Sequence, residues 1–200
     1  MWSLDDYKLV FIALGLAGVL LCSLPAASVF LRFPDGERFS ELYVLGPKHT
    51  AEDYPFNVKA GEPYSIYLGI GNNMGSSTYY VARIKFRNAT DPCPNATMGT
   101  ESSLPVLYER RVFLQDGATW ETHLSFFLNK IAFSGNMCWV DSLIVEDASA
   151  KVDKLAYWNT QNNGYYFNFF IELYIYRTES DSIEYHERFV GILLNMTDVS

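Results

Sequence analysis

The chain has 200 residues, of which 49% are hydrophobic, and this suits one folded domain plus an appendage. Its formal net charge is −8, with 23 acidic residues against 15 Lys and Arg that are scattered along the chain. Because nucleic-acid binding needs a concentrated basic surface, this charge excludes an electrostatic nucleic-acid binder. Aromatic residues reach 16% of the chain and favour a protein built mostly of β-strands.

Residues 9–31 form an uncharged, apolar run of 23 residues between Lys8 and Arg32. At ~1.5 Å of rise per residue, a helix of this length crosses the ~30 Å hydrocarbon core of a bilayer. We therefore expect a short N-terminal tail at residues 1–8, a transmembrane signal-anchor helix in contact with membrane lipid at 9–31, a connector at 32–38 and a folded domain at 39–200.

A cleaved signal peptide is the alternative to this anchor. Residues 9–21 would serve as its hydrophobic region, and Ala26, Ala27 and Ser28 would supply small residues for cleavage. Asp5 and Asp6 fit the positively charged start of such a leader badly. The sequence therefore favours the uncleaved anchor.

Cysteines and sequons favour a domain on the outside of the membrane. Cys93 and Cys138 are consistent with one disulfide formed in an oxidising compartment. Asn88, Asn95 and Asn195 each begin an Asn-x-Thr sequon for N-glycosylation. The basic residues near the helix do not decide the side, because the positive-inside rule is counted over short loops. We expect a single-pass protein of the cell membrane with its N-terminus in the cytoplasm and its domain outside.

Short hydrophobic runs between turn residues fill the rest of the chain. We expect strands at residues 39–45, 64–71, 79–87, 106–114, 119–127, 138–145, 165–176 and 187–196. Residues 79–87 alternate as a strand with one buried face does, and residues 115–118 indicate a hairpin turn. This pattern predicts an all-β domain, an immunoglobulin-like two-sheet β-sandwich.

Residues 39–72 read FSELYVLGPKHTAEDYPFNVKAGEPYSIYLGIGN, in which a strand ends in Leu-Gly-Pro and a Gly-Glu turn precedes a Tyr-rich strand. This segment resembles the archaeal domain-of-unknown-function family 1616, as do residues 116–121 and 188–197. The resemblance implies an archaeal membrane protein with an external immunoglobulin-like domain. It implies no activity and no catalytic residue. Members of that family often carry several membrane helices, whereas this chain shows one.

The sequence contains no recognisable catalytic or metal-binding motif. His49, His123 and His186 do not have metal-ligand spacing, and no nucleophilic serine motif occurs. Glu52 and Asp53 are better explained as solvated loop residues than as the paired carboxylates of a glycosidase. We therefore expect no catalytic residue, no cofactor and no metal.

Aromatic residues between 158 and 176 are the strongest candidates for a binding surface. Trp158, Tyr165 and Tyr166 flank an amide-rich turn, and such side chains stack on sugars and bond their hydroxyls. Tyr174 belongs to an unusually aromatic second face of the next strand, which the rest of the sandwich, a partner or the membrane interface should cover. We expect a non-catalytic interaction module, an accessory subunit of a membrane or cell-envelope assembly with a protein partner. The alternative is a carbohydrate-recognising module or a glycan-handling enzyme, with a glycan as ligand.

Overall fold

The computed structural model describes residues 7–8, 10–19 and 37–197, and the chain divides into two units, Met1–Glu37 and Arg38–Ser200. In the first unit, residues 7–8 and 10–19 are helical and exposed. Residue 9 and residues 20–31 of the expected anchor lie outside the described residues, as do residues 1–6 of the tail and 32–36 of the connector. None of the helices within the described part of the chain has the length and hydropathy needed to cross a membrane.

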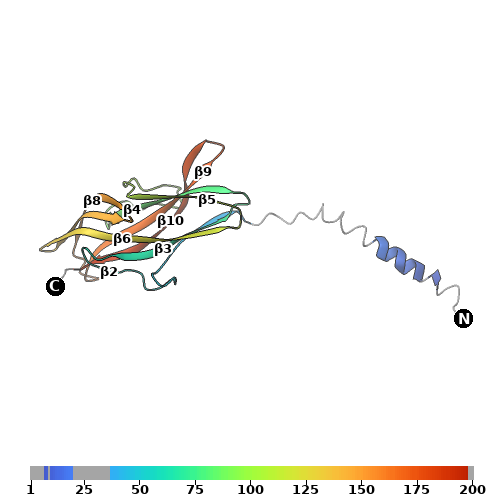
Figure 1. Ribbon diagram of the computed structural model, residues 1–200, viewed down its shortest axis with the longest axis horizontal. Helices are drawn as coiled ribbons and strands as arrows, with labels where there is room; N and C mark the ends of the chain where they lie inside the picture. Colours follow the sequence, from blue (N-terminus) through green and yellow to red (C-terminus); the bar gives the residue numbers. More distant parts are fainter. Residues whose placement is uncertain (1–6, 9, 20–36, 198–200) are drawn as a thin grey trace. The chain divides into compact units, whose positions relative to one another are not determined.

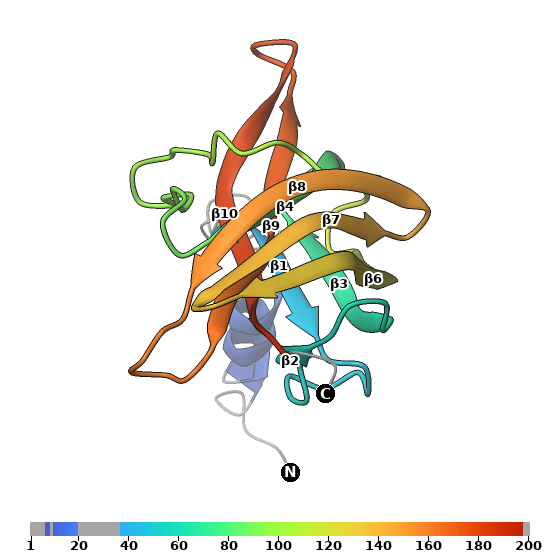
Figure 2. The same ribbon diagram turned by 90° about the vertical axis from the view of Figure 1, so that its left-hand side faces the viewer.

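The second unit is a β-sandwich of two five-stranded sheets, which confirms the all-β, two-sheet architecture expected from the sequence (Figure 1). In sheet A the strand order is β1 (Phe39–Leu45), β3 (Tyr64–Asn73), β6 (Thr119–Ser134), β7 (Met137–Val145) and β8 (Ala148–Tyr157). In sheet B it is β2 (Asn57–Val58), β10 (Ser182–Met196), β9 (Tyr165–Arg177), β4 (Thr78–Asn88) and β5 (Tyr108–Leu114). Figure 2 shows β6, β7 and β8 lying across β4, β9 and β10.

The core lies between the two sheets and is built from the alternate residues that each strand turns inward. On β3, Ile66, Leu68 and Ile70 are fully buried. Phe126 of sheet A stacks on Phe169 of sheet B, with 4.6 Å between their ring centroids. Each fully buried side chain of this size contributes roughly 1.5–3 kcal/mol of hydrophobic stabilisation.

The expected disulfide between Cys93 and Cys138 is not formed in this structure, and both thiols are free. Cys138 lies on the inward face of β7 and is fully buried, whereas Cys93 is exposed in the connection between β4 and β5. Burial raises the pKa of the Cys138 thiol to about 12, so this thiol stays protonated. Cys138 therefore acts as a small apolar residue of the core.

Candidate functional site

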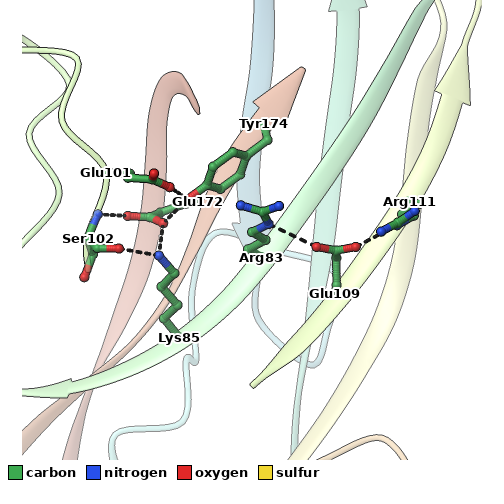
Figure 3. A network of polar contacts seen from close by, with 8 residues as sticks. All are labelled: Arg83, Lys85, Glu101, Ser102, Glu109, Arg111, Glu172 and Tyr174. Atoms are coloured by element: carbon green, nitrogen blue, oxygen red, sulfur yellow. Dashed lines mark hydrogen bonds and ion pairs between the residues drawn. The ribbon is translucent and has the colours of Figure 1, made fainter. Parts of the chain in front are cut away.

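A buried ion pair lies on the face of sheet B that points away from the core. Nζ of Lys85 on β4 lies 2.7 Å from Oε2 of Glu172 on the neighbouring strand β9, and the two side chains are 3% and 0% exposed (Figure 3). Charged residues are almost never this deeply buried unless they are paired. This pair was not anticipated from the sequence, because alternation assigned Lys85 to an exposed face.

Residues 89–107, which we call the covering segment, bury this pair. The backbone oxygen of Ser102 accepts a hydrogen bond from Lys85 at 2.5 Å, and its backbone N–H donates to Oε1 of Glu172 at 2.7 Å. Tyr174 of β9 donates to Oε2 of Glu172 at 2.9 Å and its hydroxyl also contacts Glu101 (Figure 3). The covering segment therefore satisfies both charges with its own backbone.

Tyr174 is buried, with 1% of its surface exposed, so its expected place on an accessible binding surface is wrong. The guanidinium of Arg83 lies 4.1 Å from its ring centroid, and Tyr185 packs edge-on against it. Burial, followed by the bonds to Glu101 and Glu172, raises the pKa of the Tyr174 hydroxyl. Around Phe170, Glu172 and Tyr174, the second face of β9 is thus covered by the domain itself, and the network around Tyr174 is structural.

An apolar groove lies between β1, an edge strand of sheet A, and β10, which is bordered on that side of sheet B only by the two-residue strand β2. Its cavity has a volume of about 560 Å³. The lining comprises Leu42, Tyr43, Val44, Tyr54, Pro55, Phe56, Val190, Gly191, Ile192 and Leu193. No lining residue is charged. The groove was not anticipated, because it joins strands that come from opposite ends of the domain sequence.

A second cavity, of about 270 Å³, lies where β8 meets the ends of β4 and β9. Tyr157 and Tyr166 line it together with the amides of Asn88 and Asn159. Tyr157 is 63% exposed and was missed, because β8 was not expected as a strand. Of the expected binding residues, the structure brings Tyr166 to this pocket, while Trp158 packs edge-on against Tyr165 at 5.1 Å between ring centroids.

A chain of hydrogen bonds links His186 of β10 to the core. Nε2 of His186 lies 2.8 Å from Oγ of Ser40, which lies 2.6 Å from the hydroxyl of Tyr80. Tyr80 donates its single proton to Oδ1 of Asn72 at 3.0 Å, so it must accept from Ser40. Ser40 then accepts from His186, which assigns the proton of the neutral imidazole to Nε2.

This direction is the reverse of nucleophile activation, in which a histidine accepts the serine proton. Burial, followed by the charges of Arg177 and Arg188, lowers the pKa of His186 to about 4, so the imidazole is neutral near pH 7. Ser40 is itself buried. The Ser40–His186 pair is therefore a structural contact.

The other two histidines lie apart from His186, around Tyr67 of β3. The ring of Tyr67 lies 3.9 Å from His49 and 5.4 Å from His123, measured between centroids. Nε2 of His49 lies 2.6 Å from Oε1 of Glu121. In the part of the chain that the structure describes, no group of three or more His, Cys, Asp or Glu could hold a metal ion.

Several solved structures are similar to this chain at low sequence identity. A β-glucosidase from Listeria innocua in complex with isofagomine has 11% identity and a TM-score of 0.41, over 82% of this chain but only 18% of the enzyme. The CARDB domain of a Pyrococcus furiosus protein in complex with di-metal ions has 7% identity and a TM-score of 0.40, over 83% of this chain and 94% of that domain. A chain of the complex of zinc 2-glycoprotein and prolactin inducible protein from human seminal plasma has 6% identity and a TM-score of 0.39, over 82% of this chain and 100% of its own length.

No curated protein matches this chain. A family model, described as a domain of unknown function (DUF1616), matches residues 34–151. That range covers β1 to β7 and begins a few residues before the segment whose sequence resembles the family. Because it is more than half of the chain, the chain belongs to the DUF1616 family.

Proposed function

We propose that this chain is a non-catalytic recognition module that binds an extended apolar segment of a partner protein in the groove between β1 and β10. The module is anchored in an archaeal cell membrane through residues 9–31, with its N-terminus in the cytoplasm and its immunoglobulin-like sandwich outside. This role is that of an accessory subunit in a membrane or envelope assembly.

The uncharged edge of β10 is the observation that carries this proposal. Sheet edges expose unpaired backbone groups, and proteins usually protect them with charged side chains or bulges. β8 carries Lys151, Asp153 and Lys154, and β5 carries Glu109, Arg110 and Arg111. Residues 189–194 of β10 contain no charge, and β2 pairs with this strand only at Asn195 and Met196.

A strand added along β10 would gain main-chain hydrogen bonds, and the groove would receive its alternate side chains. The apolar lining favours a partner segment whose inward side chains are uncharged. The non-catalytic character is supported by the Ser40–His186 contact, in which the histidine donates to a buried serine instead of activating it.

Replacement of Leu193 by Lys tests this function. Leu193 lines the groove and is half exposed, so the change should leave the fold intact while placing a charge in the groove. The intact protein, purified from its native membrane, should lose its partner with Leu193→Lys. Phe113→Lys is the matched control, because Phe113 is an exposed apolar residue on the charged edge strand β5. Equal partner recovery with both variants would contradict the groove as the binding site.

Carbohydrate recognition is the second candidate, favoured by the pocket at Tyr157 and Tyr166. Its volume of about 270 Å³ suits a single sugar ring, and it combines aromatic faces with amide groups. Titration with neutral mono- and oligosaccharides should shift NMR signals of the pocket, and Tyr157→Ala should abolish the shifts. Trp139→Ala, at an exposed aromatic on β7, is the control. A glycan-handling enzyme would also release a shortened product.

A further inference from the structure

We infer that Asn95 is the sequon that carries an N-linked glycan, and that Asn88 and Asn195 remain unmodified amides. A glycosylated amide nitrogen keeps one hydrogen and carries a sugar in place of the other, so it needs open space beside it. The three sequons share the Asn-x-Thr pattern, but their asparagines differ in burial and in hydrogen bonding. The inference rests on the proposed exterior location of the domain and is independent of the groove.

Asn195 is buried, with 9% of its surface exposed, and both its amide nitrogen and its amide oxygen are hydrogen-bonded within the fold. Nδ2 donates to Oδ1 of Asn57 at 2.9 Å, where β10 meets β2. Oδ1 accepts from the backbone N–H of Tyr165 at 2.9 Å. A side-chain carbon on Gly164 would come within 2.3 Å of Oδ1, which shows how closely the surroundings are packed. No sugar fits at this position.

Asn88 is half-buried and joins the end of β4 to the edge strand β8. Nδ2 donates to the backbone oxygen of Leu155 at 2.9 Å, across the gap between the two sheets. Oδ1 accepts from the backbone N–H of Asp91 at 2.8 Å and from the hydroxyl of Thr90 at 2.9 Å. The sequon threonine is therefore bound to its own asparagine, and the amide nitrogen faces another strand.

Asn95 is exposed and stands at the base of a short turn in the covering segment. Its backbone pairs with Thr100, through N–H to oxygen bonds of 2.8 and 2.9 Å in the two directions. Oδ1 accepts from the backbone N–H of Met98 at 3.0 Å, so the turn holds this amide through its oxygen. Thr97 is also exposed, so both sequon side chains are accessible.

A cavity lies beside the residue that follows Asn95. The next residue, Ala96, lines a polar cavity of about 230 Å³ together with Arg177, His186 and Arg188. The donor is an oligosaccharide linked to a lipid pyrophosphate. Nδ2 of Asn95 bonds to the anomeric carbon, the carbon–oxygen bond breaks so that the lipid pyrophosphate leaves with the bonding electrons, and the leaving pyrophosphate takes up the proton that the amide loses.

Glycopeptide mapping of the full chain, made in cells with N-glycosylation machinery and recovered folded, tests this inference. With cleavage before Asp91, which separates Asn88 from Asn95, the peptide with Asn95 should carry a glycan and the peptides with Asn88 and Asn195 should be unmodified. An unmodified Asn95, or a glycan on either other asparagine in folded protein, would overturn the inference. Asn95→Gln and Thr97→Ala should each remove the whole glycan mass. Partner recovery with Asn95→Gln reports on the groove separately, so the two proposals fail independently.

Discussion

The Lys85 ammonium and the Glu172 carboxylate lie 2.7 Å apart on adjacent strands, on the face of sheet B that does not form the core between the sheets. Neither side chain has appreciable contact with solvent, because Ser102 of the covering segment bonds to both. The hydrogen bonds from Lys85 and Glu172 to Ser102 thus hold residues 89–107 against the sheet and replace the water that would otherwise solvate the two charges. The pair ties an irregular segment to a regular sheet.

Breaking this pair should destabilise the domain strongly. Glu172→Gln leaves the Lys85 ammonium buried without its counter-charge, which costs roughly 3–5 kcal/mol in unfolding free energy. Urea denaturation measures the loss. The double variant Lys85→Met with Glu172→Leu should recover most of it, since a buried ion pair replaced by apolar residues is often neutral.

Lys48 and Asp53 form the control for that experiment, because they make an ion pair of the same 2.7 Å length on the surface. Their side chains are mostly exposed to water, which screens the pair, so Lys48→Met should leave the unfolding free energy nearly unchanged. Similar effects of the two single substitutions would contradict the structural role of the buried pair.

Tyr174→Lys should destabilise the domain instead of weakening partner capture. The ring is buried between Arg83 and Tyr185, and its hydroxyl bonds to Glu172. Loss of a large buried aromatic costs about 3–5 kcal/mol, and the added charge beside Arg83 adds repulsion. Tyr176→Lys, two residues further along β9 and exposed, should have little effect. A folded Tyr174→Lys protein with normal stability would show that this face is accessible.

Gly191→Ala should also destabilise the sandwich, because β10 and β9 approach closely there. An added Cβ would lie 2.8 Å from Oδ1 of Asn168 and 3.1 Å from the backbone oxygen of Phe169. The backbone atom cannot move without disturbing β9, so we expect a loss of about 1–3 kcal/mol. Gly117→Ser is the control, because Gly117 lies in a turn with open space around it and only its φ of 73° disfavours a side chain there. A Gly191→Ala protein as stable as the wild type would contradict the close approach.

Local patterns predicted most of the strands, and all eight expected ones are present. β1 spans the expected residues 39–45, because an apolar run ends there at Gly46 and Pro47. β8 was missed because Val152 and Leu155 are its only large aliphatic residues, while Lys151, Asp153 and Lys154 are charged. The two-residue strand β2 is too short to leave a pattern.

Contacts between distant residues were not predictable from those patterns. Alternation shows that Tyr174 and Glu172 share a face, but it does not show what covers that face. The hydrogen bond between Ser102 and Glu172 joins residues 70 positions apart. The groove likewise is lined by β1 and β10, which lie at opposite ends of the domain sequence. Of the expected binding residues, Tyr166 lines a pocket, and it was proposed from its amide-rich turn, which is a local signal.

His186 should make the stability of the domain depend on pH. Its pKa is lowered from 6.5 to about 4 in the fold, first by burial and then by Arg177 and Arg188. The unfolded chain therefore binds a proton on this histidine between these two pH values, and the folded chain does not. The stabilisation is complete above about pH 6.5 and is lost as the pH falls towards 4.

His186→Gln is the variant that isolates this effect, because glutamine keeps an N–H that can donate to Ser40 but does not titrate near neutral pH. Carboxylates also titrate at the low end of the range, so the comparison uses the difference in unfolding free energy between the two proteins. Urea denaturation at several pH values from 4.5 to 7.5 measures it. We expect the wild type to lose stability faster than His186→Gln as the pH falls below about 6.5, because only the wild type has the imidazole that the unfolded chain protonates. Parallel curves for the two proteins would show that His186 is protonated equally in both states and would contradict its neutral, donating role.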